Sequence, residues 1–195
     1  TQNTAAALNL PAGTWAAEIT DSNGCVATDT VVLAEAAAFN ATVVVNQTVA
    51  CFGESNGQAT VSASGTGLTY QWDDPLLQQT ATANNLPAGT WNVVVASSQT
   101  CDTTLTVVIT EPNELTLIAV ENQQVSCNGG ADGIALVTQL GGTAGFTYQW
   151  DDPSLQVTAS ATGLVAGTYN VVVTDANLCS ATASVVITEA SAISI

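Results

Sequence analysis

The sequence has no positively charged side chain. Its 195 residues include no Lys, Arg, His or Met but 16 Asp and Glu, which gives a net charge of −16, whereas ordinary composition supplies roughly 20 Lys and Arg. Nucleic acid is therefore excluded as a partner, because its phosphates require cations, and anionic membrane surfaces repel the chain. General acid–base catalysis by His or Lys and anion binding by Arg are excluded as well. We predict a non-enzymatic segment without salt bridges that tolerates high salt.

Membrane and metal-binding signals are also scarce. No apolar run approaches the roughly 20 residues that span a bilayer, and no basic region precedes an apolar stretch at the amino end. Export signals are therefore expected outside these residues. The five cysteines have no CxxC spacing and no His partner, which argues against a zinc site.

What the sequence does contain is a repeat. The segment Leu86–Trp91 copies Leu10–Trp15 at an offset of 76 residues and returns as Leu164–Tyr169 after a further 78. Similarity at a nearly fixed period indicates a tandem array. The same offsets relate Cys25, Cys101 and Cys179, and also Glu35, Glu111 and Glu189. Because each of these Glu residues follows the expected last strand, we predict the C-terminal part of one repeat at 1–36 and complete repeats at 37–112 and 113–195.

Each repeat is predicted to be all-β. Short stretches of alternating β-branched residues are separated by Gly, Asn, Asp and Pro, and no segment indicates a helix. In the last repeat the expected strands are Leu115–Val120, Ile134–Leu140, Phe146–Trp150, Leu155–Ala161, Thr168–Thr174 and Ala181–Thr188. Six or seven short strands are typical of a small antiparallel Greek-key sandwich of the immunoglobulin type. Trp72 and Trp150 are the expected core aromatics, and the two-residue length difference between the repeats falls in a turn, 65–67 against 141–145.

The cysteines allow two disulfide patterns. Each complete repeat has one cysteine near its start and one near its end, so pairing Cys51 with Cys101 and Cys127 with Cys179 would staple each repeat and leave Cys25 for a partner outside this segment. The alternative joins neighbours, Cys25 to Cys51 and Cys101 to Cys127. We favour the first pattern, although geometry rather than spacing decides. Either pattern predicts an oxidising, extracellular environment.

The order of several motifs resembles a known family. These motifs are Cys127–Gly133, Gly141–Gly142, Phe146–Trp150, Leu164–Tyr169, Val173–Asp175, Cys179 and Ile187–Glu189. In this order and spacing they resemble the SprB-type repeat of large cell-surface adhesins in gliding Bacteroidetes, a relative of the PKD-like sandwich. The resemblance implies a tandem array of Ig-like or PKD-like domains, export through the type IX secretion system and a role in adhesion or gliding motility. It supplies no catalytic residues.

Three further features have competing interpretations. Adjacent carboxylates at Asp73–Asp74 and Asp151–Asp152 could hold Ca²⁺, although two side chains supply only part of its six to eight oxygen ligands; a solvated turn before proline is the alternative. No other cofactor is expected. The aromatic side chains could form a sugar-binding platform, but core packing explains them better. Thr30 and Thr103 follow Asp in a pattern that resembles a Bacteroidetes O-glycosylation acceptor.

Two functions remain after these exclusions. The first is a structural or adhesive stalk of a secreted surface or filament protein, whose partners are neighbouring repeats, identical chains in a filament, and a surface polysaccharide or another adhesive target that the sequence does not name. The alternative is a carbohydrate-binding or spacer module of a secreted polysaccharide-degrading enzyme. Repetition without a variable pocket favours the first function.

Overall fold

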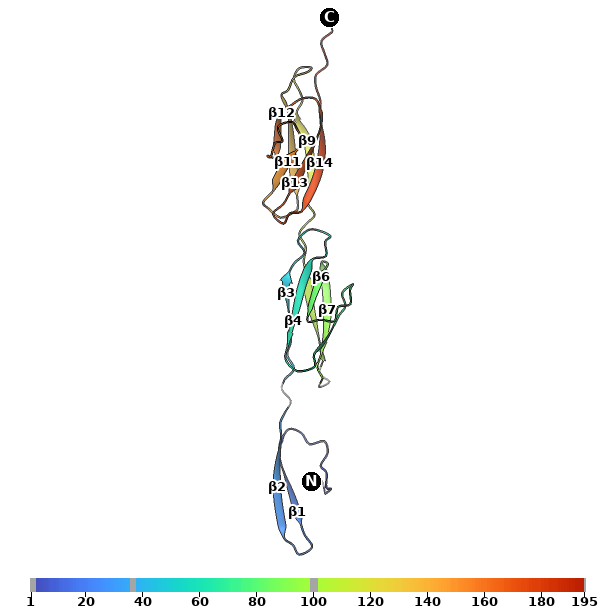
Figure 1. The fold of residues 1–195 in the computed structure, drawn as a ribbon, viewed down its shortest axis with the longest axis vertical. Coiled ribbons are helices and arrows are strands. Elements are labelled where there is room, and N and C mark those ends of the chain that lie inside the picture. Colours follow the sequence, from blue (N-terminus) through green and yellow to red (C-terminus); the bar gives the residue numbers. More distant parts are fainter. Residues whose placement is uncertain (1–2, 36–37, 99–101, 195) are drawn as a thin grey trace. The chain divides into compact units, whose positions relative to one another are not determined.

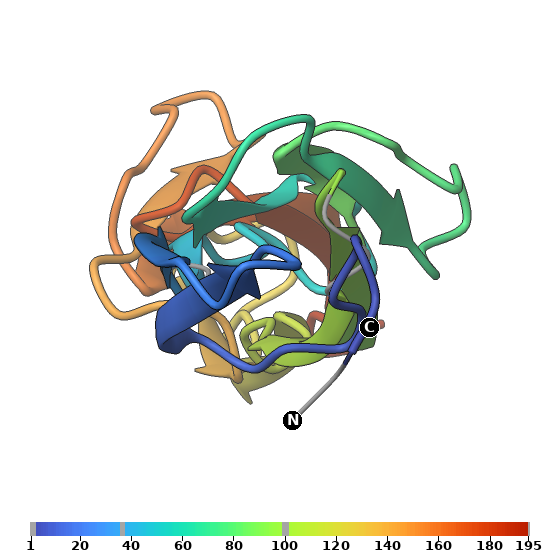
Figure 2. The ribbon, with the colours of Figure 1, turned by 90° about the horizontal axis from the view of Figure 1, so that it is seen from below.

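The computed structural model describes residues 3–35, 38–98 and 102–194. These residues form fourteen strands and no helix (Figures 1 and 2). They divide into two compact units, Thr1–Asn40 and Ala41–Ile195. The prediction of an all-β chain is therefore confirmed.

Among the described residues, no helix is long and apolar enough to cross a membrane.

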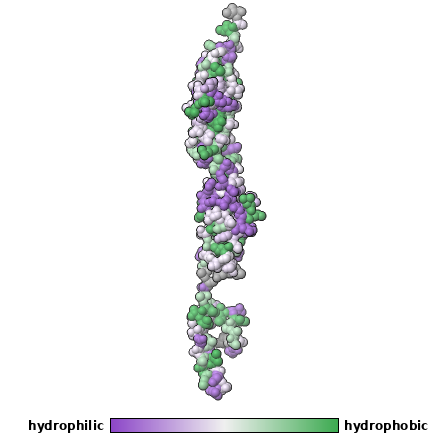
Figure 3. All heavy atoms as spheres, in the orientation of Figure 1, coloured by the Kyte–Doolittle hydropathy of each residue, from purple (hydrophilic) through white to green (hydrophobic). Residues whose placement is uncertain are grey.

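The first unit contains a single β-hairpin. Strands β1 (Gly13–Thr20) and β2 (Val26–Leu33) pair antiparallel over their full lengths. Large apolar side chains on this hairpin are exposed, including Ile19 at 71% and Val32 at 70%, and Figure 3 shows hydrophobic residues on the visible face of this unit. By sequence offset, the hairpin corresponds to the last two strands of each complete repeat. Among the described residues of this unit, no further strand covers these apolar side chains.

The second unit contains two repeats with the same strand topology. The first has one sheet of order β3-β4-β6 and another of order β5-β7-β8, and the second has β9-β10-β12 and β11-β13-β14; all pairs within them are antiparallel. The first repeat's strands are β3 (Ala41–Gln47), β4 (Gly57–Ala63), β5 (Thr69–Trp72), β6 (Thr82–Leu86), β7 (Gly89–Ala96) and β8 (Asp102–Ile109). The second repeat's strands are β9 (Thr116–Gln123), β10 (Gly133–Leu140), β11 (Thr147–Trp150), β12 (Ser160–Leu164), β13 (Gly167–Thr174) and β14 (Ser180–Ile187).

The core of each repeat follows from strand alternation. Along β13 the side chains of Tyr169, Val171 and Val173 are buried, whereas the intervening residues face outward. Trp150 is completely buried and its indole Nε1 donates a hydrogen bond to the Thr158 carbonyl at 2.9 Å. Trp72 in the first repeat is also fully buried. The two tryptophans predicted as core aromatics therefore occupy the cores.

One predicted strand is misplaced. Residues 155–159 form a loop, and strand β12 begins only at Ser160. The cause is local: the carboxylate of Asp152 accepts hydrogen bonds from the amides of Ser154 and Gln156, and Leu155 between them has a left-handed φ of 48°. Backbone amides that point at a side chain cannot pair with a neighbouring strand.

The longer turn of the second repeat lies between β10 and β11, where the two-residue difference was expected. It requires glycine at its start. Gly141 has a φ of 70°, and a Cβ atom there would lie 2.0 Å from the carbonyl oxygen of Glu114. The turn therefore packs against the segment that connects the two repeats.

Replacing adjacent valines on β13 tests which face is buried. Val171→Ala removes two methyl groups from a fully buried position, so we expect the free energy of unfolding to fall by about 2 kcal/mol. Val172→Ala, at a position 39% exposed, should cost at most about 1 kcal/mol. Urea unfolding followed by far-UV circular dichroism measures both values; equal losses would contradict the assigned faces.

Candidate functional site at the junction between repeats

A rigid loop presents Cys51 after strand β3. The Ala50 amide donates to Asn56 Oδ1 at 2.9 Å, and the Gly53 amide donates to Glu111 Oε2 at 2.6 Å. Gly53 has a φ of 77°, a conformation that side chains other than glycine rarely adopt. Glu111 comes from the end of the repeat, so its carboxylate fixes the cysteine loop beside the point where the chain passes to the next repeat.

A second rigid element presents Cys179 between strands β13 and β14. Asp175 is 3% exposed, and its Oδ1 accepts hydrogen bonds from the amides of Asn177 and Cys179, both at 2.9 Å. Its Oδ2 accepts from the amide of Thr143 at 2.8 Å, which ties the hairpin to the longer turn. One carboxylate therefore binds the hairpin at two amides and the longer turn at a third.

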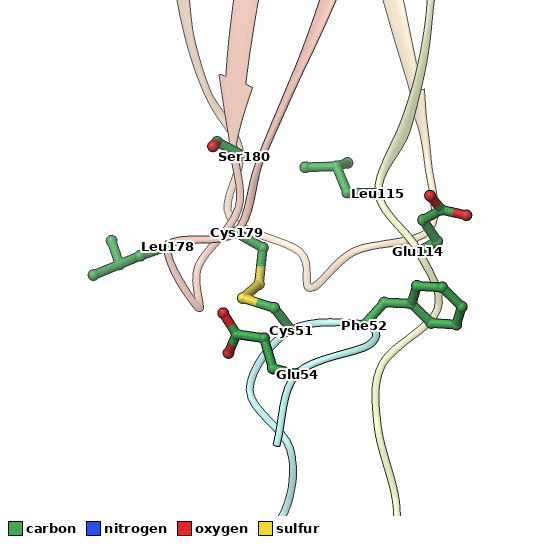
Figure 4. A pocket seen from close by; sticks show the side chains of 8 residues that line it. All are labelled: Cys51, Phe52, Glu54, Glu114, Leu115, Leu178, Cys179 and Ser180. Atoms are coloured by element: carbon green, nitrogen blue, oxygen red, sulfur yellow. A yellow bond between two sulfur atoms is a disulfide. The ribbon is translucent and has the colours of Figure 1, made fainter. Parts of the chain in front are cut away.

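These two elements meet in a disulfide between neighbouring repeats (Figure 4). Cys51 is bonded to Cys179 with a Cα–Cα distance of 5.6 Å across a sequence separation of 128. Beside it, the Asn177 Nδ2 donates to the Ala50 carbonyl at 2.9 Å. The disulfide borders a pocket of about 380 Å³, whose other lining residues are Phe52 and Glu54 from the loop, Glu114 and Leu115 from the connecting segment, and Leu178 and Ser180 from the hairpin.

This disulfide corrects both expected pairing patterns. The structure joins the first cysteine of one repeat to the last cysteine of the following repeat. Within one repeat, Cys127 lies beside the end of β14, where the Val125 amide donates to the Thr188 carbonyl at 2.8 Å, whereas Cys179 directly precedes the start of that strand. Eight extended residues separate the two thiols by about 27 Å, far beyond the roughly 7 Å that a disulfide tolerates between Cα atoms.

The remaining predicted cysteines have different outcomes. Cys25 and Cys127 are exposed free thiols, so the predicted partner of Cys127 is wrong and Cys25 has no partner among the described residues. Cys101 lies outside those residues.

The first carboxylate of each Asp pair binds an asparagine. Asp73 Oδ1 and Oδ2 accept from the backbone amide and the side-chain amide of Asn92, at 2.7 and 2.8 Å. Asp151 binds Asn170 in the same way, at 2.8 and 2.7 Å. The bond from the Asn92 backbone amide, followed by that from its side chain, lowers the pKa of Asp73 below its ordinary value. These carboxylates therefore link the turn after the core tryptophan to the adjacent strand.

The second carboxylate of each pair is buried in its own loop. Asp152 is 2% exposed and accepts hydrogen bonds from the amides of Ser154 and Gln156 and from the Gln156 side chain, at 2.9 to 3.0 Å. Asp74 makes the same three bonds in the first repeat. Burial raises the pKa of Asp152, but the bonds from Gln156 and Ser154 together outweigh it and leave the pKa below its ordinary value.

This arrangement bears on the calcium hypothesis for Asp73, Asp74, Asp151 and Asp152. In each pair the two carboxylates bind different N–H donors instead of sharing one site. In the described part of the chain, no group of three or more His, Cys, Asp or Glu residues is placed to hold a metal ion. A structural role thus accounts for all four carboxylates, and calcium binding stays a prediction.

The other predicted sites have defined positions. Thr30 is exposed on β2, and Thr103 is half-buried on β8; O-glycosylation of either stays a prediction. The aromatic residues at the start of the long hairpins bind the turn that precedes them: the Trp91 indole donates to the Pro87 carbonyl at 3.0 Å, and the Tyr169 hydroxyl donates to the Val165 carbonyl at 3.1 Å.

Comparison with known families adds one assignment. The model of the SprB repeat family matches residues 119–155. Residues 119–155 are thus similar to part of an SprB repeat. The match runs from β9 to the loop after β11, and thus includes Cys127, the core Trp150 and the Asp pair. No curated protein matches the chain.

Several solved structures of adhesion proteins are similar at low identity. A C-terminal fragment of intimin, in complex with the intimin-binding domain of its translocated receptor, has 14% identity and a TM-score of 0.41 over 78% of this chain and 64% of the fragment. The N-terminal eight Ig domains of Down syndrome cell adhesion molecule have 11% identity and a TM-score of 0.44 over 91% of this chain and 28% of that chain. This chain thus spans less than two thirds of either. Because both TM-scores are below 0.5, neither similarity supports a conclusion about this chain.

Acid unfolding of an Asp152→Asn variant tests the buried carboxylate. Hydrogen bonds lower the pKa of Asp152 in the folded state. The ionised carboxylate therefore stabilises the fold fully at pH values above the pKa of about 4 that Asp has in the unfolded chain, and this stabilisation is lost as the pH falls through the lower pKa of the folded state. At neutral pH we expect the variant to lose about 1–3 kcal/mol, because its amide group faces N–H donors. Its stability should also depend less on pH below about 4. Urea unfolding at several pH values measures both effects, and Asp102→Asn, at an exposed position, is the control. If the unfolding free energy of Asp152→Asn falls with pH as steeply as that of the unmodified chain, the assignment is contradicted.

Proposed function

We propose that this chain is a non-enzymatic structural or adhesive segment of a secreted cell-surface protein. The observation that supports this function best is the disulfide between Cys51 and Cys179, which links two neighbouring repeats covalently. The SprB repeat at 119–155 agrees with a surface adhesin, and a disulfide agrees with an oxidising, extracellular setting.

The position of the disulfide gives it a mechanical consequence. A pulling force on the two ends of the chain would pass from Cys51 directly to Cys179 and bypass the residues between them. This bypass protects most of both repeats from unfolding under load, because a covalent bond replaces their noncovalent contacts in the force path. We therefore propose that the junction is built to carry tension along an extracellular stalk.

Single-molecule stretching tests this proposal. The chain would carry Ser at positions 25, 101 and 127, so that only Cys51 and Cys179 remain, and would be held by tags at its two ends. The 128-residue separation corresponds to about 430 Å of extended chain. We expect the fully stretched contour to be shorter by this length before reduction than after it.

The control is the same chain with Cys51→Ser and Cys179→Ser. It should show the longer contour under both conditions. If the unreduced chain also reaches the longer contour, the disulfide does not form and the tension-bearing function is wrong.

The finer assignments are part of the proposal. Export by the type IX secretion system, a role in gliding and assembly into filaments with identical chains rest on the SprB resemblance. The alternative carbohydrate-binding module receives less support, because the aromatic rings that could stack on a sugar include Trp72 and Trp150, which are completely buried.

A further inference from the structure

One sheet of the second repeat has an apolar outer face. Strand alternation turns Leu117 and Ala119 of β9 toward the core, where they pack against buried residues, so the side chains between them point outward. On the central strand β10, Ala135 and Val137 are buried in the same way. The outward apolar side chains of these two strands form the β9–β10 face, which consists of Ile118, Val120, Ile134, Leu136 and Leu140.

The side chains of the β9–β10 face are partly open to solvent. Val120 and Leu136 are partners in the antiparallel register and therefore lie side by side. Ile118 is 54% exposed and Leu140 is 55% exposed, whereas Ile134 and Leu136 are half-buried. In the part of the chain that the structure describes, solvent thus contacts much of an apolar surface that extends across two paired strands.

The same face of the first repeat is polar. Both repeats have the same strand topology, so the positions of the β9–β10 face have counterparts 76 residues earlier. There, Gln58 Nε2 donates a hydrogen bond to Asn84 Oδ1 at 2.6 Å, and the hydroxyl oxygens of Thr60 and Thr82 are 3.0 Å apart. The counterparts of Ile118, Ile134 and Leu136 are Thr42, Gln58 and Thr60. The fold therefore does not require apolar side chains at these positions.

The β9–β10 face also has no charge, although the chain has a net charge of −16. Glu121 is the only charged residue in β9, β10 and β12. Its partner in the register, Ala135, is buried, so Glu121 belongs to the opposite side of the sheet, where its Oε1 accepts a hydrogen bond from the Thr188 amide at 2.6 Å. A cationic partner would gain no attraction from this face, whereas a chain of the same negative charge could approach it without opposing carboxylates.

We infer that the β9–β10 face is a docking surface for the same face of a second copy of this chain. Two such faces pack about 10 Å apart with roughly aligned strands, as the two sheets of a sandwich do. The contact is isologous, because each copy supplies the same residues, and its uncharged centre is typical of protein interfaces. This association goes beyond the proposed function, because it joins chains side by side and does not involve the disulfide.

The size of the face determines the strength of the association. Five side chains provide much less than the roughly 800 Å² per partner that a stable complex buries, so we expect a reversible dimer with a dissociation constant on the order of 0.1 mM. The carboxylates elsewhere on the two copies repel each other, and salt screens this repulsion. Salt should therefore strengthen the dimer, whereas it would weaken a complex held by opposite charges.

Sedimentation equilibrium of the full chain tests the inference. The chain carries Ser at positions 25, 101 and 127, which excludes disulfide-linked copies. Between about 0.02 and 1 mM protein we expect a monomer–dimer equilibrium. Its association constant should rise at least about threefold between roughly 0.1 and 0.5 M NaCl.

Two matched variants locate the contact. Leu136→Thr introduces the residue that the first repeat has at this position and should weaken the dimer at least about tenfold, because both copies lose an apolar side chain from the interface. Val172→Thr is the control. Val172 is 39% exposed on the other sheet of the same repeat, so this change should leave the association constant unchanged.

Concentration-dependent NMR spectra locate the contact without a substitution in the face. The amide signals of residues 116–120 and 134–140 should shift as the protein concentration rises, and those of β13 and β14 should not. Reduction of the Cys51–Cys179 disulfide should leave these shifts unchanged, because all strands of the face belong to one repeat. The dimer and the tension-bearing disulfide of the proposed function can therefore fail independently.

Four results would overturn the inference. A chain that stays monomeric at about 1 mM would leave the face to a different protein. Equal association constants for Leu136→Thr and its parent chain, or NMR shifts confined to another surface, would place the contact elsewhere. An association that weakens with salt would show that opposite charges, and not the uncharged face, hold the copies together.

Discussion

The junction depends on one constraint, the straight antiparallel strand that ends each repeat. Strand β14 pairs with β13 along its whole length, from Ser180 to Ile187. It therefore places Cys179 at one end of the sandwich and Glu189, which binds the Cys127 loop, at the other. The two cysteines of one repeat cannot meet across this length. Cys179 instead bonds to Cys51 of the neighbouring repeat, so the register of a single strand determines which repeat Cys179 can reach.

The absence of cations determines what the carboxylates do. Here Asp and Glu accept hydrogen bonds from backbone amides and from Asn and Gln side chains, as Asp152, Asp175 and Glu189 illustrate. The half-buried Asp132 follows this pattern too, because hydrogen bonds from the side chain and amide of Ser126 lower its pKa. In the parts of the chain that the structure describes, no buried side-chain nitrogen or oxygen lacks a partner. A chain whose charged side chains are all negative can therefore organise its loops without salt bridges.

Sequence patterns predicted the fold better than the junction. Alternation along β13 and the repeated tryptophans follow from local rules, and the structure confirms both. The strand expected from Leu155 was wrong because Asp152 withdraws two amides from sheet pairing, which an apolar pattern does not reveal. The disulfide was missed because spacing alone does not indicate the end of the sandwich at which each cysteine lies. The only available signal was that Cys179 precedes the last strand whereas Cys127 precedes the second strand of the repeat, and interpreting it requires the topology.

Overlap between successive junctions follows from the same geometry. The loop closed by Cys51 and Cys179 contains Cys127, so a junction formed at Cys127 would begin inside a loop that is already closed. If the bond between Cys51 and Cys179 then broke under tension, the force would follow the chain from Cys51 to Cys127 and leave it there through the next disulfide. Only 76 residues, about 260 Å of extended chain, would be stretched, instead of the full loop. An array linked in this pattern would thus limit the length released by any single break. Disulfides within each repeat could not do this, because their loops would not overlap.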